Sequence, residues 1–215
     1  MTTSSIANKI ANEIISAIEG AHHEYVKWSG GYWLWRAPEY FTTVRIADKL
    51  IKLKEISYIE LEHGVRDALE IAGANGPGRR PKLLRVNGRF DILLYGEKND
   101  AGDYLPMTAV EVKVRPWDHQ KSDEDVCRLI ELIKLRNRNS IQFSVFAFHV
   151  SYDNGRRDKA GTRIKNFFKR IEGKTEETLT NSKYKNISKK IISGDIHVES
   201  TSAWCAGTMI LQTGC

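Results

Sequence analysis

"GRFDILLYGEKNDAGDYLPMTAVEVKV" (residues 88–114) holds two apolar runs separated by a segment rich in turn-forming residues. In residues 110–114 valines alternate with Glu111 and Lys113, which is the period of a strand with one apolar face. The earlier run, "FDILLY", is equally typical of a strand. The segment at 97–104 is short and polar. We therefore predict an antiparallel hairpin whose loop has eight residues or fewer.

Upstream of this hairpin the sequence predicts helices. Residues 6, 10, 14 and 18 are all isoleucine, a spacing typical of one helix face, and either Ser4 or Ser5 is the expected N-cap. Pro38 is typical of a first-turn proline that opens a second helix. A third helical stretch is expected over about residues 58–72, before a loop rich in glycine and proline.

Downstream, "KSDEDVCRLIELIKL" (121–135) predicts a helix that is capped by Ser122, with Asp125 three residues later as in a capping box. The nearly continuous apolar run "IQFSVFAFHVSY" (141–152) is typical of a central strand covered on both faces. The remaining expected elements are a basic helix over about 161–171 and late strands, expected toward a sheet edge, at 195–200 and 203–212.

Together these elements predict an α/β protein with a mixed central sheet flanked by helices. A chain of 215 residues supports one substantial core, so we expect a single domain over residues 1–215. Its core is expected in about residues 35–150. Residues 1–34 would form an N-terminal helical extension, and residues 156–215 would add the basic helix and the late strands.

The composition excludes several classes of protein. Hydrophobic residues make up 41% of the chain, yet no apolar run approaches the roughly 20 residues of a membrane-spanning helix. The N-terminus lacks the basic start and continuous apolar block of a signal peptide. The chain has three cysteines, Cys127, Cys205 and Cys215. Their odd number does not suggest a disulfide framework, and their wide spacing does not suggest a zinc site. We therefore expect a cytoplasmic protein without a membrane partner.

The net charge of +6 is concentrated in one segment. Residues 156–190 hold twelve Lys and Arg against four Asp and Glu, so the rest of the chain is slightly acidic. Such a segment indicates a polyanionic partner, with nucleic acid the leading candidate, or else a solvated lysine-rich helix face. The candidate nucleic-acid-binding residues are Arg89, Arg163, Lys165, Lys169 and Arg170.

Asp91 lies in the middle of an apolar run, and a buried carboxylate without a partner is destabilising. Glu111 and Lys113 on the adjoining strand are its natural partners. Two carboxylates close together attract a divalent cation, and hard oxygen ligands favour Mg²⁺. A lysine beside the metal can orient the attacking water. The same three side chains could instead form a structural salt bridge.

The chain resembles the PD-(D/E)xK, or restriction-endonuclease-like, nuclease superfamily. The resemblance lies in the order of its parts: Asp91 on a hairpin, the tripeptide "EVK" at 111–113, then a helix and a buried strand. The resemblance covers roughly residues 35–150 in the order of elements. It implies that Asp91 and Glu111 bind Mg²⁺ or Mn²⁺, assisted by the main-chain carbonyl of Val112. It also implies that Lys113 activates or positions water.

Many members of this superfamily add an acid from a helix that precedes the hairpin. Glu39 is our choice for that role, with Glu60 and Glu62 as rivals. Phe90 stands where the name of the motif places a proline, which weakens the recognition without changing the chemistry. No additional glutamine motif identifies a subfamily.

The resemblance implies a Mg²⁺-dependent nuclease that hydrolyses phosphodiester bonds by in-line attack of a metal-activated water, with DNA as the favoured substrate. Endonuclease and exonuclease action, and RNA as a substrate, stay open. Enzymes that cut both strands are commonly dimers, so a homodimer is one expected assembly. The alternative is a catalytically silent nuclease fold that serves as a binding or assembly module in a phage, defence or repair complex.

Other aromatic and imidazole side chains are assigned structural positions. We expect His22 and His23 at the polar surface, because no metal-ligand pattern surrounds them. We expect Trp28, Trp33 and Trp35 in the core and not as platforms for stacked bases.

Overall fold

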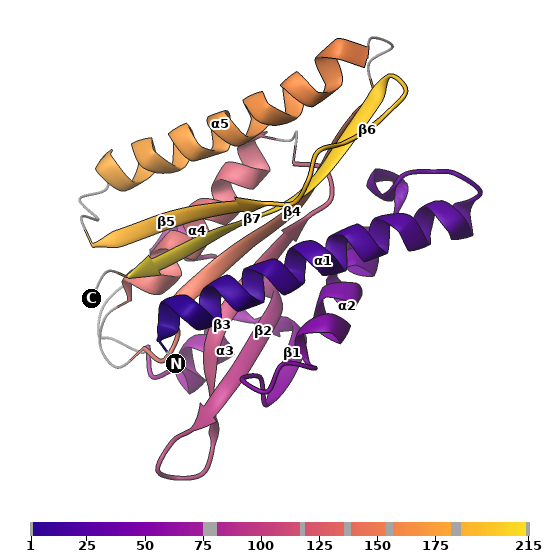
Figure 1. Cartoon of the computed structure of the whole chain (residues 1–215). Coiled ribbons are helices and arrows are strands. Elements are labelled where there is room, and N and C mark those ends of the chain that lie inside the picture. Colours follow the sequence, from indigo (N-terminus) through magenta and orange to yellow (C-terminus); the bar gives the residue numbers. More distant parts are fainter. Residues whose placement is uncertain are drawn as a thin grey trace.

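The computed structural model describes residues 2–74, 81–116, 119–135, 139–153, 157–181 and 186–213. Within these residues the chain forms an α/β fold with one mixed sheet of seven strands and five α-helices (Figure 1). The helices are α1 (Thr3–Ser29), α2 (Glu39–Leu50), α3 (Val65–Ile71), α4 (His119–Lys134) and α5 (Arg157–Asn181), with 3₁₀ turns η1 (Leu34–Arg36) and η2 (Lys82–Leu84). The strands are β1 (Tyr58–Gly64), β2 (Arg89–Lys98), β3 (Tyr104–Lys113), β4 (Phe143–Asp153), β5 (Ile187–Ser193), β6 (His197–Glu199) and β7 (Ser202–Thr213). None of the described helices is long and apolar enough to cross a membrane.

The strands lie in the order β1–β2–β3–β4–β7–β5, and β6 pairs with β7. The predicted hairpin is confirmed as β2–β3, joined by residues 99–103. β3 and β4 are parallel, and α4 forms the crossover between them, since a parallel pair requires the chain to return to the same end of the sheet. β4 lies in the middle of the sheet, as its apolar run predicts.

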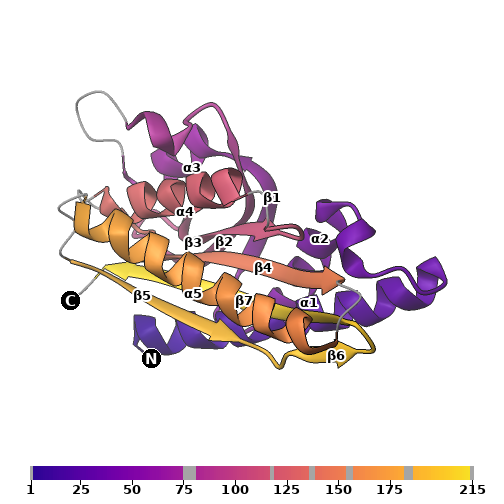
Figure 2. The ribbon, with the colours of Figure 1, turned by 90° about the horizontal axis from the view of Figure 1, so that it is seen from above.

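Helices cover both faces of the sheet (Figure 2). α1 and α2 pack on one face, where Ile10, Ile14 and Ile18 join the same apolar cluster as Val110 and Val112 of β3. α3, α4 and α5 pack on the opposite face. The valines of β3 therefore anchor the strand against α1, while the alternating residues Glu111 and Lys113 face the layer of α4.

Residues 58–64 form β1, so the helix predicted over residues 58–72 is wrong in its first half. Ile59 and Leu61 alternate with Glu60 and Glu62, which is the period of a strand, and the backbone pairs with β2. Only the second half of the stretch is helical, as α3. Pairing with an existing strand decides the conformation of so short a segment.

Both predicted helix caps are wrong. α1 is capped by Thr2, whose side-chain oxygen accepts the N–H of Ser5 at 3.4 Å, and not by Ser4 or Ser5. α4 begins at His119, so Ser122 and Asp125 lie inside the helix. A residue inside a helix can present its side chain to a neighbouring strand, and Asp125 does so.

Of the two predicted late strands, β7 is more central than expected, whereas β6 pairs with β7 alone among the described strands, as expected of an edge strand. β7 lies between β4 and β5, and its residues 203–211 are buried. β5, which the sequence did not predict, pairs with the far side of β7. The basic helix is confirmed and extends well beyond the predicted range, as α5.

One surface assignment, His22, and one core assignment, Trp28, are also wrong. His22 is only 1% exposed, and its ring stacks on Trp204 with centroids 3.9 Å apart. His22 Nδ1 lies 3.0 Å from His149 Nε2. His23 is exposed, as expected, whereas Trp28 is 62% exposed and lies outside the core.

Candidate active site

Strand register and helix packing bring the predicted site residues together. The antiparallel register of β2 and β3 sets Asp91 beside Glu111 across the two strands. Lys113 lies two residues further along β3, on the same face as Glu111. The ammonium of Lys113 lies 3.1 Å from Oε1 of Glu39, the first residue of α2. Residues from three separate elements thus form one cluster.

Asp91 is held against the backbone of the neighbouring strand. Its Oδ2 accepts the main-chain N–H of Val112 at 2.6 Å. Burial raises the pKa of Asp91 to about 6, against the lowering effects of the Val112 N–H and of the Lys113 charge. The negative charges of Glu39 and Glu62 add to the rise. Asp91 therefore carries a carboxyl group that titrates close to neutral pH.

Glu111 is buried, with 1% of its surface exposed, and it forms an ion pair with Arg128 of α4. Burial raises the pKa of Glu111 well above its ordinary value, although the guanidinium of Arg128 opposes that rise. The charges of Asp91 and Asp125 reinforce it. Arg128 is the cation that accompanies this carboxylate in the structure.

Lys113 is bound between two acids. Besides Glu39, its ammonium contacts Asp125 Oδ2 at 3.3 Å. Burial disfavours the ammonium charge, yet the carboxylates of Asp125, Glu39 and Asp91 hold the pKa of Lys113 above its ordinary value. Glu39 also accepts the main-chain N–H of Val114 at 3.2 Å through its second oxygen. The lysine is thus charged and its direction is constrained.

The three candidate upstream glutamates occupy different places. Glu39 reaches the cluster through Lys113. Glu62 lies opposite Asp91 in the register of β1 against β2, and its backbone has a left-handed φ of 54°. Glu60 contacts other groups: it accepts the Tyr95 hydroxyl at 2.8 Å and pairs with His63. Glu39 and Glu62 therefore belong to the neighbourhood of Asp91, and Glu60 does not.

Asp125 and Arg128 are the site residues that sequence reasoning missed. They lie one turn apart on α4, with Arg128 Nη2 3.9 Å from Asp125 Oδ1, and they contact Glu111 and Lys113 of β3, respectively. A spacing of three residues on the helix that follows the "EVK" strand is the signal that could have found them. The capping-box interpretation concealed it.

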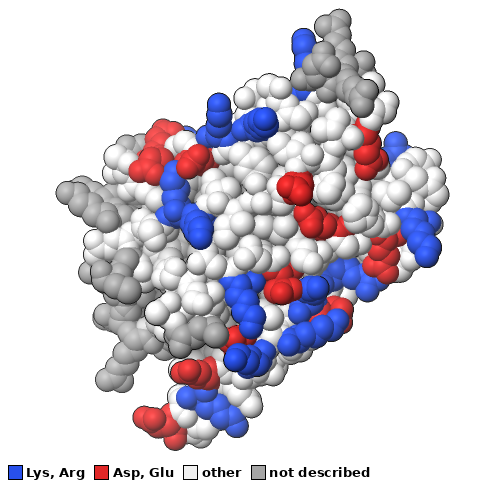
Figure 3. Space-filling model, in the orientation of Figure 1, with Lys and Arg blue, Asp and Glu red and all other residues white. Residues whose placement is uncertain are grey.

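The predicted nucleic-acid-binding residues are spread over the molecule. The side chain of Arg89 lines an open hollow beside the acid cluster, together with Glu62, Arg66 and Asn87. On α5, Arg163, Lys165 and Lys169 are exposed. Arg170 is half-buried and lies 3.4 Å from Asp123. Among the described residues on the face shown in Figure 3, basic and acidic side chains are interspersed and form no continuous basic stripe.

Comparison of the chain with models of known protein families, with curated proteins and with solved structures found no match. The residues themselves therefore carry any functional assignment.

The donor chemistry of Asp91 and Glu111 fits a hard divalent cation. Asp91 is half-buried and Glu111 is buried, both have raised pKa values, and the charge of Asp91 contributes to the rise at Glu111. A cation between them would relieve that repulsion. The third predicted ligand is the Val112 main-chain carbonyl. Within the described ranges no three His, Cys, Asp or Glu side chains are arranged to hold a metal ion.

Proposed function

We propose that this protein is a Mg²⁺- or Mn²⁺-dependent nuclease of the restriction-endonuclease-like type, which hydrolyses phosphodiester bonds in DNA. The observation that carries the proposal is the convergence of Asp91, Glu111 and Lys113 from the two strands of one hairpin, with Glu39 bound to the lysine from α2. The mixed sheet, the parallel β3–β4 pair and the intervening α4 agree with the expected order of elements.

The roles of the residues follow from their surroundings. Asp91, Glu111 and the Val112 carbonyl would hold the metal, which when bound polarises the scissile phosphate and lowers the pKa of water. The charged ammonium of Lys113, fixed by Glu39 and Asp125, would orient water for in-line attack and offset the negative charge at the phosphate. Arg66 and Arg89 in the adjoining hollow would bind neighbouring phosphates.

A cleavage assay tests this proposal. Purified protein is incubated with plasmid and linear DNA in Mg²⁺ or Mn²⁺, and the products are separated on a gel. We expect cleavage that Asp91→Ala and Lys113→Ala both abolish. Lys52→Ala is the matched control, because that lysine is an exposed partner of Asp48 on the surface. Cleavage that survives Lys113→Ala would contradict the proposal.

One observation favours the alternative of a catalytically silent binding or assembly module. Arg128 already neutralises Glu111, so the carboxylate has a cation without a metal. Calorimetric titration with Mn²⁺ separates the two functions: the nuclease binds the metal, and Asp91→Asn weakens binding. A silent module shows no metal-dependent heat and binds its partner equally well in EDTA.

A further inference from the structure

The connection between α1 and α2 presents aromatic side chains to solvent. Trp28, near the end of α1, is 62% exposed, and Tyr32 is 53% exposed. Trp35 in the 3₁₀ turn η1 is half-buried. Soluble proteins bury most tryptophan side chains, so an exposed group of this kind marks an interaction surface.

Arginines lie over these rings. The guanidinium carbon of Arg36 lies 4.2 Å from the Tyr32 ring centroid and 5.0 Å from that of Trp35. The guanidinium of Arg115 lies 5.6 Å from the Trp35 ring, and its Nε donates to the Trp35 main-chain oxygen at 2.6 Å. Both arginines are exposed. On this surface the aromatic rings of Tyr32 and Trp35 therefore lie next to the positively charged guanidinium groups of Arg36 and Arg115.

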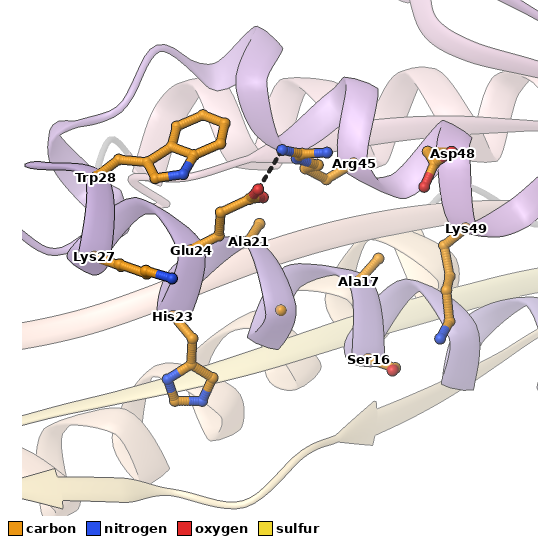
Figure 4. Close-up of a pocket in the computed structure, with 11 residues that line it drawn as sticks. Ser16, Ala17, Ala21, His23, Glu24, Lys27, Trp28, Arg45, Asp48 and Lys49 are labelled. Carbon is orange, nitrogen blue, oxygen red and sulfur yellow. Dashed lines mark hydrogen bonds and ion pairs between the residues drawn. The ribbon is translucent and has the colours of Figure 1, made fainter.

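Trp28 directly precedes Ser29, whose hydroxyl hydrogen-bonds to the Tyr32 backbone, and it lies at a pocket between α1 and α2 (Figure 4). Lys27 and Trp28 line one end of the pocket, and Arg45 lies 5.4 Å from the indole ring. Glu24 pairs with Arg45 at 2.5 Å, which leaves Lys27 as the exposed positive charge next to Trp28. We call the following set the aromatic platform: Lys27, Trp28, Tyr32, Trp35, Arg36 and Arg115.

The aromatic platform adjoins the candidate active site along two chain segments. Arg115 follows Lys113 by two residues, and Glu39 follows Trp35 by four. The two segments are joined where Glu39 accepts the Val114 N–H and contacts the Lys113 ammonium. A polymer bound on the platform would therefore extend to Lys113.

We propose that the aromatic platform binds single-stranded polynucleotide by stacking unpaired bases, and so selects single-stranded segments as the substrate. This inference rests on the proposed nuclease function and specifies its substrate class. Bases in a duplex have their faces covered by neighbouring pairs, so exposed rings can stack only on unpaired bases. The arginines and Lys27 complement the phosphate charge of the same strand. An acidic protein partner would use the charges but would leave the rings without a stacking partner.

Fluorescence anisotropy in EDTA tests binding apart from cleavage. Labelled oligo-dT, oligo-U and a duplex of equal length are titrated with the full chain. We expect tighter binding of single strands than of duplex, with the dT and U arms deciding between DNA and RNA. Tyr32→Ala and Trp28→Ala should each weaken single-strand binding roughly 5- to 100-fold, and Trp28→Phe should restore most of it.

Tyr104→Ala is the matched control, because Tyr104 is also exposed and lies 4.6 Å from a cation, Lys98, but at the start of β3 near the hairpin loop. It should bind like the unchanged protein. The proposal is wrong if the protein binds duplex as tightly as single strands. It is also wrong if Tyr32→Ala and Trp28→Ala both bind single strands as tightly as the unchanged protein. Single-strand binding that persists in Lys113→Ala, without cleavage by the unchanged protein, supports the platform and refutes the nuclease.

Discussion

Arg128 on α4 forms an ion pair with the buried carboxylate of Glu111 on β3, and its Nη1 also donates to the main-chain oxygen of Arg89 at 3.1 Å. One guanidinium therefore ties the crossover helix to both strands of the hairpin. The pair is buried, so each charge depends on the other for its compensation.

Arg128→Met should lower the free energy of unfolding by about 3–5 kcal/mol, because it leaves the Glu111 carboxylate buried without its cation. Glu111→Gln combined with Arg128→Met should recover much of this loss. Urea unfolding measures both values, with Arg163→Met on the exposed side of α5 as the control. Equal stabilities for the single and the double variant would show that the pair is not coupled.

Asp91 should titrate near pH 6, because burial raises its pKa from an ordinary value of 3.8. Between these two values the native state holds a proton that the unfolded state has released, so the contribution of Asp91 to stability falls as pH rises through this window. Asp91→Asn should remove that contribution. Carboxyl ¹³C NMR checks the pKa directly. Glu62→Gln should lower the pKa of Asp91 and Lys113→Met should raise it, and an unshifted carboxyl would contradict the prediction.

The paired histidines should make the protein less stable in acid. Burial lowers the pKa of His22 and of His149 from 6.5 to about 3. The two neutral histidines contribute fully to the free energy of unfolding above pH 6.5, and this contribution is lost as pH falls toward 3. The loss is up to about 1.4 kcal/mol per pH unit for each proton taken up on unfolding. His149→Gln should flatten this dependence in denaturation measured from pH 7 to pH 4. The charge of the neighbouring His23 adds to the lowering at His22, so His23→Gln should raise the pKa of His22 slightly and weaken the dependence less than His149→Gln does.

Asp125→Asn should reduce DNA cleavage by about 10- to 100-fold, because Lys113 loses one of the two carboxylates that fix its direction. The pKa of the Lys113 ammonium should fall in the same variant, which NMR of the lysine side chain detects. Asp48→Asn on α2 is the control, since Asp48 pairs with the exposed Lys52. If the pKa of Lys113 falls and the cleavage rate is unchanged, Lys113 has no role in the reaction.

Local pattern was sufficient for much of the fold. The alternation around Glu111 and Lys113 predicts β3 and the face each residue occupies, and the apolar run at 141–152 predicts the central strand β4. These predictions succeed because a strand in a covered sheet must place its apolar residues on the faces that are buried. The same pattern brought Asp91 beside Glu111, because both lie on one hairpin.

Non-local pairing decided the elements that were predicted wrongly. Residues 58–64 become β1 because β2 supplies its hydrogen bonds, and β7 becomes central because β5 pairs with its outer side. His22 is buried because α1 lies across the sheet next to Trp204. β2 and Trp204 lie far along the chain from the segments they contact, whereas β5 and β7 are separated only by the short segment that contains β6.

The sequence by itself determined that two carboxylates and a lysine share one hairpin face. Only the tertiary structure decided their partners: Glu39 from α2 and Asp125 for Lys113, and Arg128 from α4 for Glu111. The physical reason is that alternation along a strand is a local property, fixed by backbone geometry. The meeting of charges from separate helices depends on how those helices pack on the sheet.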